Sequence, residues 1–334
     1  NHKAAVFVST MPDVLVTMLT LPAVVIWPDY RAIFLACLGW PLIRCILSHT
    51  TSQRPYRLSM NPTLVGKLLK FSWPLMLSGL LLFLVFHGDR AVVGHYFSMH
   101  ELGFFSLVLT AFLLPSQLLH KVYDSLFLSS LSKAFRHRDR FESQQFLIWH
   151  SLFALSTAYV LFSILLGPWL FIFLFGEKYE PGLEVLPWIV LMVSVRILRI
   201  ATSMLALATA KPYCELYANL VRASALPIAI IGLAMGYPIE CVPIAGIIGE
   251  VLALFVGLVS LNLPVSHAVK PPAVSGMIML WLASMVFITA EIVIDINPPY
   301  VSATLAAVLL ITMILFFIKQ YPKFTIERGF QNDV

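Results

Sequence analysis

Long apolar runs separated by short polar segments are the dominant pattern of this sequence. The clearest run begins at Phe71, where eighteen residues without a charge reach Gly88 and are followed directly by Asp89 and Arg90. A helix of about 20 apolar residues crosses a hydrocarbon layer of about 30 Å. The run therefore predicts a membrane-spanning helix that carries two charges toward one end.

The same pattern recurs along the chain and predicts an all-α, polytopic membrane bundle with ten transmembrane helices. The predicted helices cover residues 4–27, 32–48, 71–96, 102–131, 146–174, 185–208, 215–235, 241–263, 275–294 and 300–318. The polar segment 49–70 predicts a cytoplasmic linker between two bundles. The expected parts are the last two helices of a first bundle (1–48), the linker (49–70), a six-helix bundle (71–263), two terminal helices (264–318) and a cytoplasmic tail (319–334).

Composition supports this class. The chain is 59% hydrophobic and 12% charged, whereas soluble domains are about half apolar and a quarter charged. This composition indicates an integral membrane protein. The formal net charge is +5, but the basic residues are dispersed over short loops, which is typical of the positive-inside rule rather than of a nucleic-acid partner.

The distribution of Lys and Arg also predicts the orientation. With the N-terminus in the cytoplasm and ten alternating spans, fourteen Lys and Arg residues fall on the cytoplasmic side and two, Arg31 and Lys178, on the opposite side. Such asymmetry is what the positive-inside rule describes. We therefore expect both ends of the chain to be cytoplasmic.

Catalytic and metal-binding motifs are missing from the sequence. No loop exceeds about twenty residues, and the sequence contains no HExxH, no CxxC and no glycine-rich phosphate loop. The four cysteines lie in or beside apolar spans and are interpreted as small buried hydrophobic residues. We expect no enzyme, no metal site and no cofactor.

Charged residues within the predicted spans are the candidates for function, because charge in a bilayer normally faces a protein interior or a wet cavity. The basic ones are Arg44, Arg90, Lys121, Arg196, Arg199 and Arg222, and the acidic ones are Asp13, Asp89, Asp124 and Glu250.

Three of these arginines fall near mid-span on neighbouring helices. Arg196 and Arg199 are three residues apart and share a helix face, and Arg222 lies at similar depth on the next helix. Together they are able to line a cationic cavity, since a guanidinium binds phosphate bidentately. The alternative is a set of structural interhelical pairs with Glu250. We favour the cavity because one central carboxylate does not neutralise three arginines.

The other charges leave alternatives open. Asp89 and Arg90 are adjacent, hence about 100° apart on a helix, and pair poorly with each other; they form either a gate or an interface anchor. Asp13 follows Pro12 and is either a protonatable coupling site or a partner for backbone groups freed by the proline. Lys121 and Asp124, three residues apart, are expected to form a local structural pair.

Several segments resemble one family in their order and spacing. Residues 71–94 and the segment ELGFFSLV (101–108) resemble the start of the C-terminal bundle in polysaccharide flippases of the multidrug/oligosaccharidyl-lipid/polysaccharide exporter superfamily. LFGEKYEPGLEVLPWI (174–189) resembles the turn after the ninth helix of that family. AKPYCELYANLVRA (210–223) and PIAGIIGEVLAL (243–254) resemble its eleventh and twelfth helices.

The resemblance implies that the ten spans are helices five to fourteen of fourteen, preceded by four further helices. It implies a bacterial cytoplasmic (inner) membrane protein that moves undecaprenyl-diphosphate-linked oligosaccharide by alternating access. The substrate would meet Arg196, Arg199, Arg222 and Arg90, while Asp89, Glu250 or Asp13 would couple a proton or sodium ion or act in gating. The expected partners are the lipid-linked substrate, membrane lipid and a polysaccharide polymerase or export machinery.

Other functions fit the sequence less well. A multidrug exporter of the same superfamily typically concentrates acidic residues, whereas the mid-span excess here is basic. A lipid II flippase remains an alternative. A multispanning glycosyltransferase or polymerase would need catalytic carboxylates or a large extracytoplasmic loop, and the largest such loop here, residues 176–184, is short.

Overall fold

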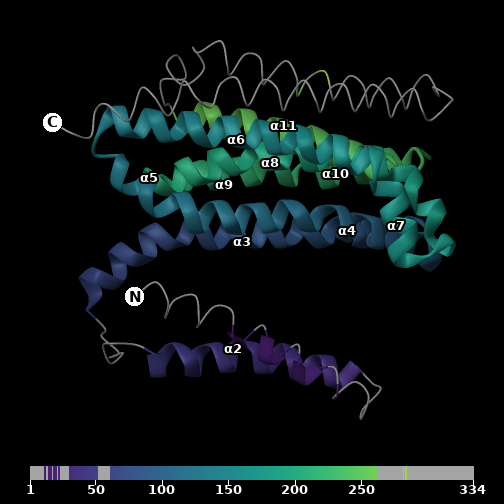
Figure 1. The fold of residues 1–334 in the computed structure, drawn as a ribbon, viewed down its shortest axis with the longest axis horizontal. Helices are drawn as coiled ribbons and strands as arrows, with labels where there is room; N and C mark the ends of the chain where they lie inside the picture. Colours follow the sequence, from purple (N-terminus) through teal and green to yellow (C-terminus); the bar gives the residue numbers. More distant parts are fainter. Residues whose placement is uncertain are drawn as a thin grey trace. The chain divides into compact units, whose positions relative to one another are not determined.

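The computed structural model describes residues 30–51 and 61–261, with the further positions 11–12, 14–16, 18–20, 22, 281 and 283. Within these residues every regular element is a helix, as predicted (Figure 1). The chain divides into two compact units, residues 1–67 and 68–334. In the first unit, α2 (Tyr30–Thr51) confirms the second predicted helix. Asp13, most of the first predicted helix and the two predicted terminal helices lie outside the described residues.

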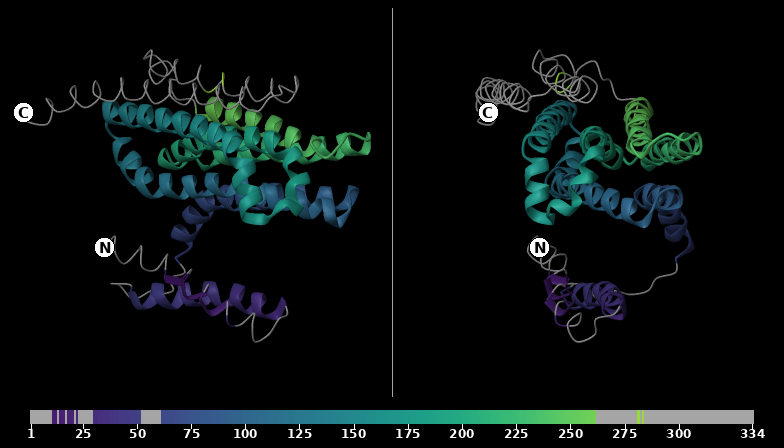
Figure 2. Two further views of the ribbon diagram at one scale, coloured as in Figure 1. Left: turned by 45° about the vertical axis from the view of Figure 1, so that its right-hand side comes forward. Right: turned by 90° about the vertical axis from the view of Figure 1, so that its right-hand side faces the viewer.

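The second unit contains a bundle of long apolar helices that lie along a common direction (Figures 1 and 2). Six helical segments in the described residues are long and apolar enough to cross a membrane: Pro62–Tyr96, Met99–Ala134, Asp139–Leu165, Glu177–Ala208, Pro212–Ala234 and Cys241–Leu261. The protein is therefore a multi-pass membrane protein. These spans correspond to the third to eighth predicted helices.

Three of the predicted helices are interrupted. The fourth consists of α4 (Met99–Tyr123), a π-helical segment η1 (Asp124–Leu128) and α5 (Ser129–Ala134). It begins earlier than predicted because Ser98 and Glu101 form a capping box at its start.

The fifth predicted helix divides into α6 (Arg138–Leu165) and α7 (Gly167–Phe175). The seventh divides into α9 (Pro212–Ala223) and α10 (Ala225–Ala234). Each break lies just before a proline, Pro168 or Pro227. Proline lacks the backbone N–H of a helical hydrogen bond and clashes with the preceding turn. The predicted polar turn 176–184 is instead the 3₁₀ helix η2 (Glu177–Val185).

Helix α8 (Leu186–Ala208) is the centre of the core. Nearly all its side chains are buried, against α4, α6 and α11 (Cys241–Leu261) among others. Burial on all sides is typical of a helix that is apolar all round. The two arginines that α8 carries at mid-length are therefore held inside protein.

Small residues bring α11 close to its neighbours. A Cβ atom added at Gly249 would lie 2.9 Å from the carbonyl oxygen of Arg222, and one at Gly257 would lie 3.2 Å from Cβ of Thr202. Small residues at helix interfaces let backbones approach closely. This approach places Glu250, the residue after Gly249, between α8 and α9.

Among the six membrane-spanning segments, α3 (Pro62–Tyr96) is the least buried. Its buried residues are Pro74, Ser78, Val85 and Val93. Many of its large apolar side chains are exposed, including Met76, Leu80 and Phe83. An apolar helix with so much uncovered surface meets lipid or another part of the protein.

Candidate functional site

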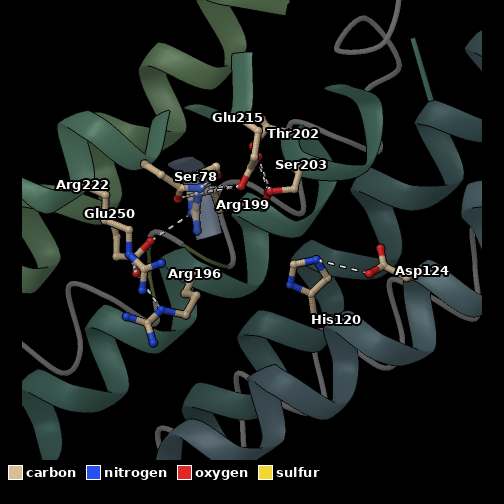
Figure 3. Close-up of polar contacts among 11 residues, drawn as sticks. Ser78, His120, Asp124, Arg196, Arg199, Thr202, Ser203, Glu215, Arg222 and Glu250 are labelled. Carbon is tan, nitrogen blue, oxygen red and sulfur yellow. Dashed lines mark hydrogen bonds and ion pairs between the residues drawn. The ribbon is translucent and has the colours of Figure 1, made fainter. Parts of the chain in front are cut away.

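Three arginine side chains meet one carboxylate at mid-length of the central helices (Figure 3). On α8, Arg196 Nε donates to Glu250 Oε1 at 2.6 Å, and Arg199 Nε donates to Glu250 Oε2 at 3.1 Å. From α9, Arg222 Nε lies 2.7 Å from Glu250 Oε1. The structure thus brings together four of the predicted site residues. Interhelical pairing with Glu250, the alternative set out above, is part of the arrangement.

A second carboxylate joins this group, and sequence reasoning missed it. Glu215 Oε1 lies 3.6 Å from Arg199 Nη1, and Glu215 Oε2 accepts a hydrogen bond from Ser203 at 2.7 Å. Two carboxylates, rather than the single central one expected from the sequence, therefore face the three arginines. Glu215, Asn219 and Arg222 follow the spacing i, i+4 and i+7, which places them on one face of α9 and is the signal that would have found Glu215.

Asn219 connects three helices. Its Oδ1 accepts from Arg199 Nη1 at 3.0 Å, and its Nδ2 donates to Glu215 Oε1 at 3.0 Å and to Ser78 Oγ of α3 at 2.6 Å. The side chain is buried, and a buried amide with satisfied hydrogen bonds fixes the groups around it. We call Arg196, Arg199, Glu215, Asn219, Arg222 and Glu250 the arginine cluster.

The arginines differ in how well their donors are satisfied. Arg199 donates to both Glu250 and Asn219. Arg222 is only 1% exposed, yet Nη1 and Nη2 have no hydrogen-bond partner among the described residues, and its Nε faces Glu250 without an aligned hydrogen bond. Arg196 Nη1 is also buried without a partner. Leaving the donors of a buried charged group unsatisfied is costly. A ligand that accepts hydrogen bonds from Arg222 and Arg196 would remove this cost.

One face of α3 lies against these two arginines. The Phe86 ring centre is 5.1 Å from the guanidinium carbon of Arg196 and 5.2 Å from that of Arg222, which is cation–π distance. Asp89, three residues further along the same face of α3, forms no ion pair with either arginine, both of which pair with Glu250. Phe86 is a site residue that sequence reasoning missed, because a phenylalanine in an apolar run carries no signal of its own.

Arg90 lies apart from the cluster. Its Nη2 donates to Thr110 Oγ1 of α4 at 2.6 Å, and it makes no hydrogen bond or ion pair with a member of the cluster. Asp89 and Arg90 thus interact with different helices, as expected for adjacent helical positions. The predicted roles of Arg90 in binding, and of Asp89, Glu250 and Asp13 in coupling or gating, remain predictions.

Asp124 pairs differently from the prediction. Its Oδ2 lies 3.6 Å from His120 Nε2 (Figure 3), whereas Lys121 is exposed and forms no ion pair with it. The i, i+4 spacing of His120 and Asp124 brings the two side chains together just where the helix widens into the π-helical η1. In the described part of the chain, no group of three or more His, Cys, Asp or Glu side chains is arranged to hold a metal ion.

Comparison with known families identifies the class of protein. The family described as polysaccharide biosynthesis protein matches residues 1–184. The chain belongs to this family. The match covers more than half of the 334 residues and confirms the family likeness predicted from the sequence. No curated protein and no solved structure matches the chain significantly. The arginine cluster follows residue 184 and therefore lies outside the matched segment.

Proposed function

We propose that this member of the polysaccharide biosynthesis protein family is a flippase. In this proposal it moves undecaprenyl-diphosphate-linked oligosaccharide from the inner to the outer face of a bacterial cytoplasmic membrane. The observation that carries the proposal is Arg222, a fully buried guanidinium near the middle of the apolar segment Pro212–Ala234 whose terminal nitrogens have no hydrogen-bond partner among the described residues. The family and the six apolar helices support the same conclusion.

The chemistry of the substrate explains why such a group is needed. An isolated anion in a medium of low dielectric constant costs tens of kcal/mol by Born solvation. A diphosphate therefore does not cross the hydrocarbon layer without fixed positive charge to meet it. Guanidinium groups suit this role because they remain charged and bind phosphate oxygens through two parallel N–H donors.

The geometry assigns different roles to the three arginines. Arg222 and Arg196 have donors left over, so we propose that they bind the phosphate oxygens. Arg199 has two good hydrogen bonds and lies between Glu215 and Glu250. Its proposed role is to hold these carboxylates so that they do not neutralise the other two arginines completely. This differs from the expectation that all three arginines hold the substrate.

Transport then requires the cluster to open to each side of the membrane in turn, with the helix bundles moving about a fixed site. A proton or sodium ion is the expected driving ion, and a polysaccharide polymerase or export machinery is the expected downstream partner. The chain itself carries out no covalent chemistry in this scheme.

Cationic substrates fit the site poorly. Both oxygens of Glu250 are engaged by arginines, and Glu215 is engaged by Arg199, Ser203 and Asn219. A drug exporter for cations would need an excess of carboxylates, whereas within the cluster three arginines meet two carboxylates. Lipid II shares the diphosphate, so the same site would suit it. A strain depleted of its lipid II flippase separates the two, because only a lipid II flippase restores its growth.

The deciding experiment is complementation in a strain that lacks the gene and any paralogue. We expect the strain to accumulate lipid-linked repeat units on the cytoplasmic side and to lose surface polysaccharide. Arg222→Ala should not restore export, Arg222→Lys should restore little, and Arg136→Lys, at an exposed position, should restore it fully at equal membrane abundance. Normal surface polysaccharide in the deletion strain would refute the flippase function.

A further inference from the structure

The attachment of α3 to the rest of the second unit is thin, and part of it is at the arginine cluster. Ser78, Phe86 and Asp89 share one face of α3, at spacings of eight and three residues. Within the described residues, two side-chain hydrogen bonds join α3 to other helices: Asn219 to Ser78 and Arg90 to Thr110. The first of these reaches the cluster directly.

The charges of the cluster make one of these contacts important. Three guanidiniums meet the two carboxylates Glu250 and Glu215, which leaves one positive charge in excess. Asp89 is the further carboxylate on this face of α3, one turn beyond Phe86, whose ring centre lies 5.1 Å from the guanidinium carbon of Arg196 and 5.2 Å from that of Arg222. Because Asp89 forms no ion pair with either arginine, its electrostatic attraction to them is weaker than that of Glu250. It also comes from the least buried of the six membrane-spanning segments.

A phosphate on the substrate has the same charge and the same acceptor oxygens as the Asp89 carboxylate. We propose that Asp89 is a tethered anion that holds α3 over Arg196 and Arg222, with Phe86 covering both guanidiniums, until a substrate phosphate replaces it and releases α3. The proposal rests on the proposed function, because it requires a substrate that carries a phosphate. It explains how binding at the cluster is converted into movement of one helix, since a ligand shifts an equilibrium only by binding one state more tightly than the other.

A disulfide between α3 and α10 reports this movement. A Cβ atom at Gly88 would lie 3.3 Å from Cγ of Leu226, so cysteines at the two positions are within reach of a disulfide. The full-length protein carries Gly88→Cys and Leu226→Cys in a background in which the native cysteines are replaced by alanine. The rate of oxidative cross-linking is measured in detergent with farnesyl diphosphate, or with farnesol, which has the same chain without the diphosphate.

We expect farnesyl diphosphate to slow cross-linking by about threefold or more, a change that corresponds to a modest shift in population, and farnesol to have no effect. The matched control is Gly257→Cys with Thr202→Cys, where a Cβ at residue 257 would lie 3.2 Å from Cβ of Thr202 across the packed α8–α11 interface. Cross-linking of this pair should be unaffected by either compound, because neither helix is released.

Asp89→Asn provides a second, independent measurement. Removing the tethered anion should tighten binding of farnesyl diphosphate about three- to tenfold and should slow the α3–α10 cross-link even without the compound. Glu180→Gln, an exposed carboxylate on η2, should change neither. If the wild-type protein does not bind farnesyl diphosphate, both the site and the tethered anion are refuted. If the wild-type protein binds farnesyl diphosphate but its α3–α10 cross-linking rate is unchanged, and Asp89→Asn does not tighten binding, only the role of Asp89 as a tethered anion is refuted.

Discussion

Arg222 and Glu250 form an ion pair that leaves hydrogen-bond donors of the arginine unsatisfied. Nε of Arg222 lies 2.7 Å from Oε1 of Glu250, the oxygen that also accepts a hydrogen bond from Arg196 at 2.6 Å. One carboxylate is thereby shared among three guanidiniums, and Nη1 and Nη2 of Arg222 have no hydrogen-bond partner among the described residues. A purely structural ion pair would normally satisfy its donors, because unmet ones are costly when buried.

Removing the shared carboxylate should therefore have a large effect on stability. Glu250→Gln leaves buried arginines without their main counter-charge, and breaking a buried pair in this way costs about 3–5 kcal/mol. Thermal unfolding of the purified protein in detergent should show a strongly lowered midpoint. Glu180→Gln, which changes an exposed carboxylate, should leave the midpoint unchanged.

A second change tests whether excess positive charge is the cause. Adding Arg196→Met to Glu250→Gln removes one of the uncompensated charges, since Glu250 is the ion-pair partner of Arg196, while keeping a side chain of similar length. We expect the double variant to be more stable than Glu250→Gln alone. Equal or lower stability would show that lost packing, rather than uncompensated charge, explains the effect of the single change.

The close approach of α11 to α9 predicts a contrast between two glycines. At Gly249 a Cβ atom would lie 2.9 Å from the Arg222 carbonyl oxygen and 2.8 Å from Cβ of Ala225. Neither backbone is free to move away, so Gly249→Ala should destabilise the protein by about 1–3 kcal/mol through overpacking. It should also weaken export, because it pushes Glu250 away from the arginines.

Gly103 of α4 is the matched control, because a Cβ there would meet nothing within 4 Å. Gly103→Ala should be neutral or stabilising by up to about 1 kcal/mol, since alanine is the better helix former. Unfolding in detergent measures both variants. If the two substitutions have the same effect, the tight α9–α11 contact does not position Glu250.

The sequence predicted the membrane spans well because their signal is local. Apolar length alone predicts the core helix α8 to within one residue at its start, 185 predicted and 186 observed. The polar turn after residue 175 was also expected, although as a loop rather than as the 3₁₀ helix η2. At Pro168 the hydropathy pattern continues while the helix does not. Pro74 and Pro115, in contrast, lie inside continuous helices, so the pattern does not predict which proline ends a helix.

The candidate site was predicted in part, for reasons that lie in its tertiary structure. Mid-span depth was enough to select Arg196, Arg199, Arg222 and Glu250, because depth follows from position in a helix. Glu215 was passed over because it lies near a predicted helix end, and Phe86 because nothing in an apolar run distinguishes it. The rotation of each helix about its axis and the close contact at Gly249 decide which side chains meet. The hydropathy pattern predicts neither.

The hydrogen bond from Asn219 to Ser78 should determine how firmly α3 is held. Ser78→Ala removes a buried bond of 2.6 Å, which typically contributes about 0.5–1.5 kcal/mol. Because α3 has few other attachments, the loss should appear as faster amide hydrogen exchange within α3, with little change in α8. Ser72→Ala, on the same helix, should leave exchange unchanged. Uniformly faster exchange in all helices would indicate general destabilisation instead.

The orientation of the spans is open to a direct test at two exposed positions. With both ends in the cytoplasm, η2 lies on the outer side and the turn between α5 and α6 lies inside, as fourteen Lys and Arg residues against two predict. Single cysteines are introduced as Glu180→Cys and Arg136→Cys, both at exposed sites, in a background without the native cysteines. A membrane-impermeant maleimide added to spheroplasts should label residue 180 and should label residue 136 only after lysis. The reverse pattern would invert the topology, so that the proposed substrate would have to enter the arginine cluster from the side on which the oligosaccharide is not made.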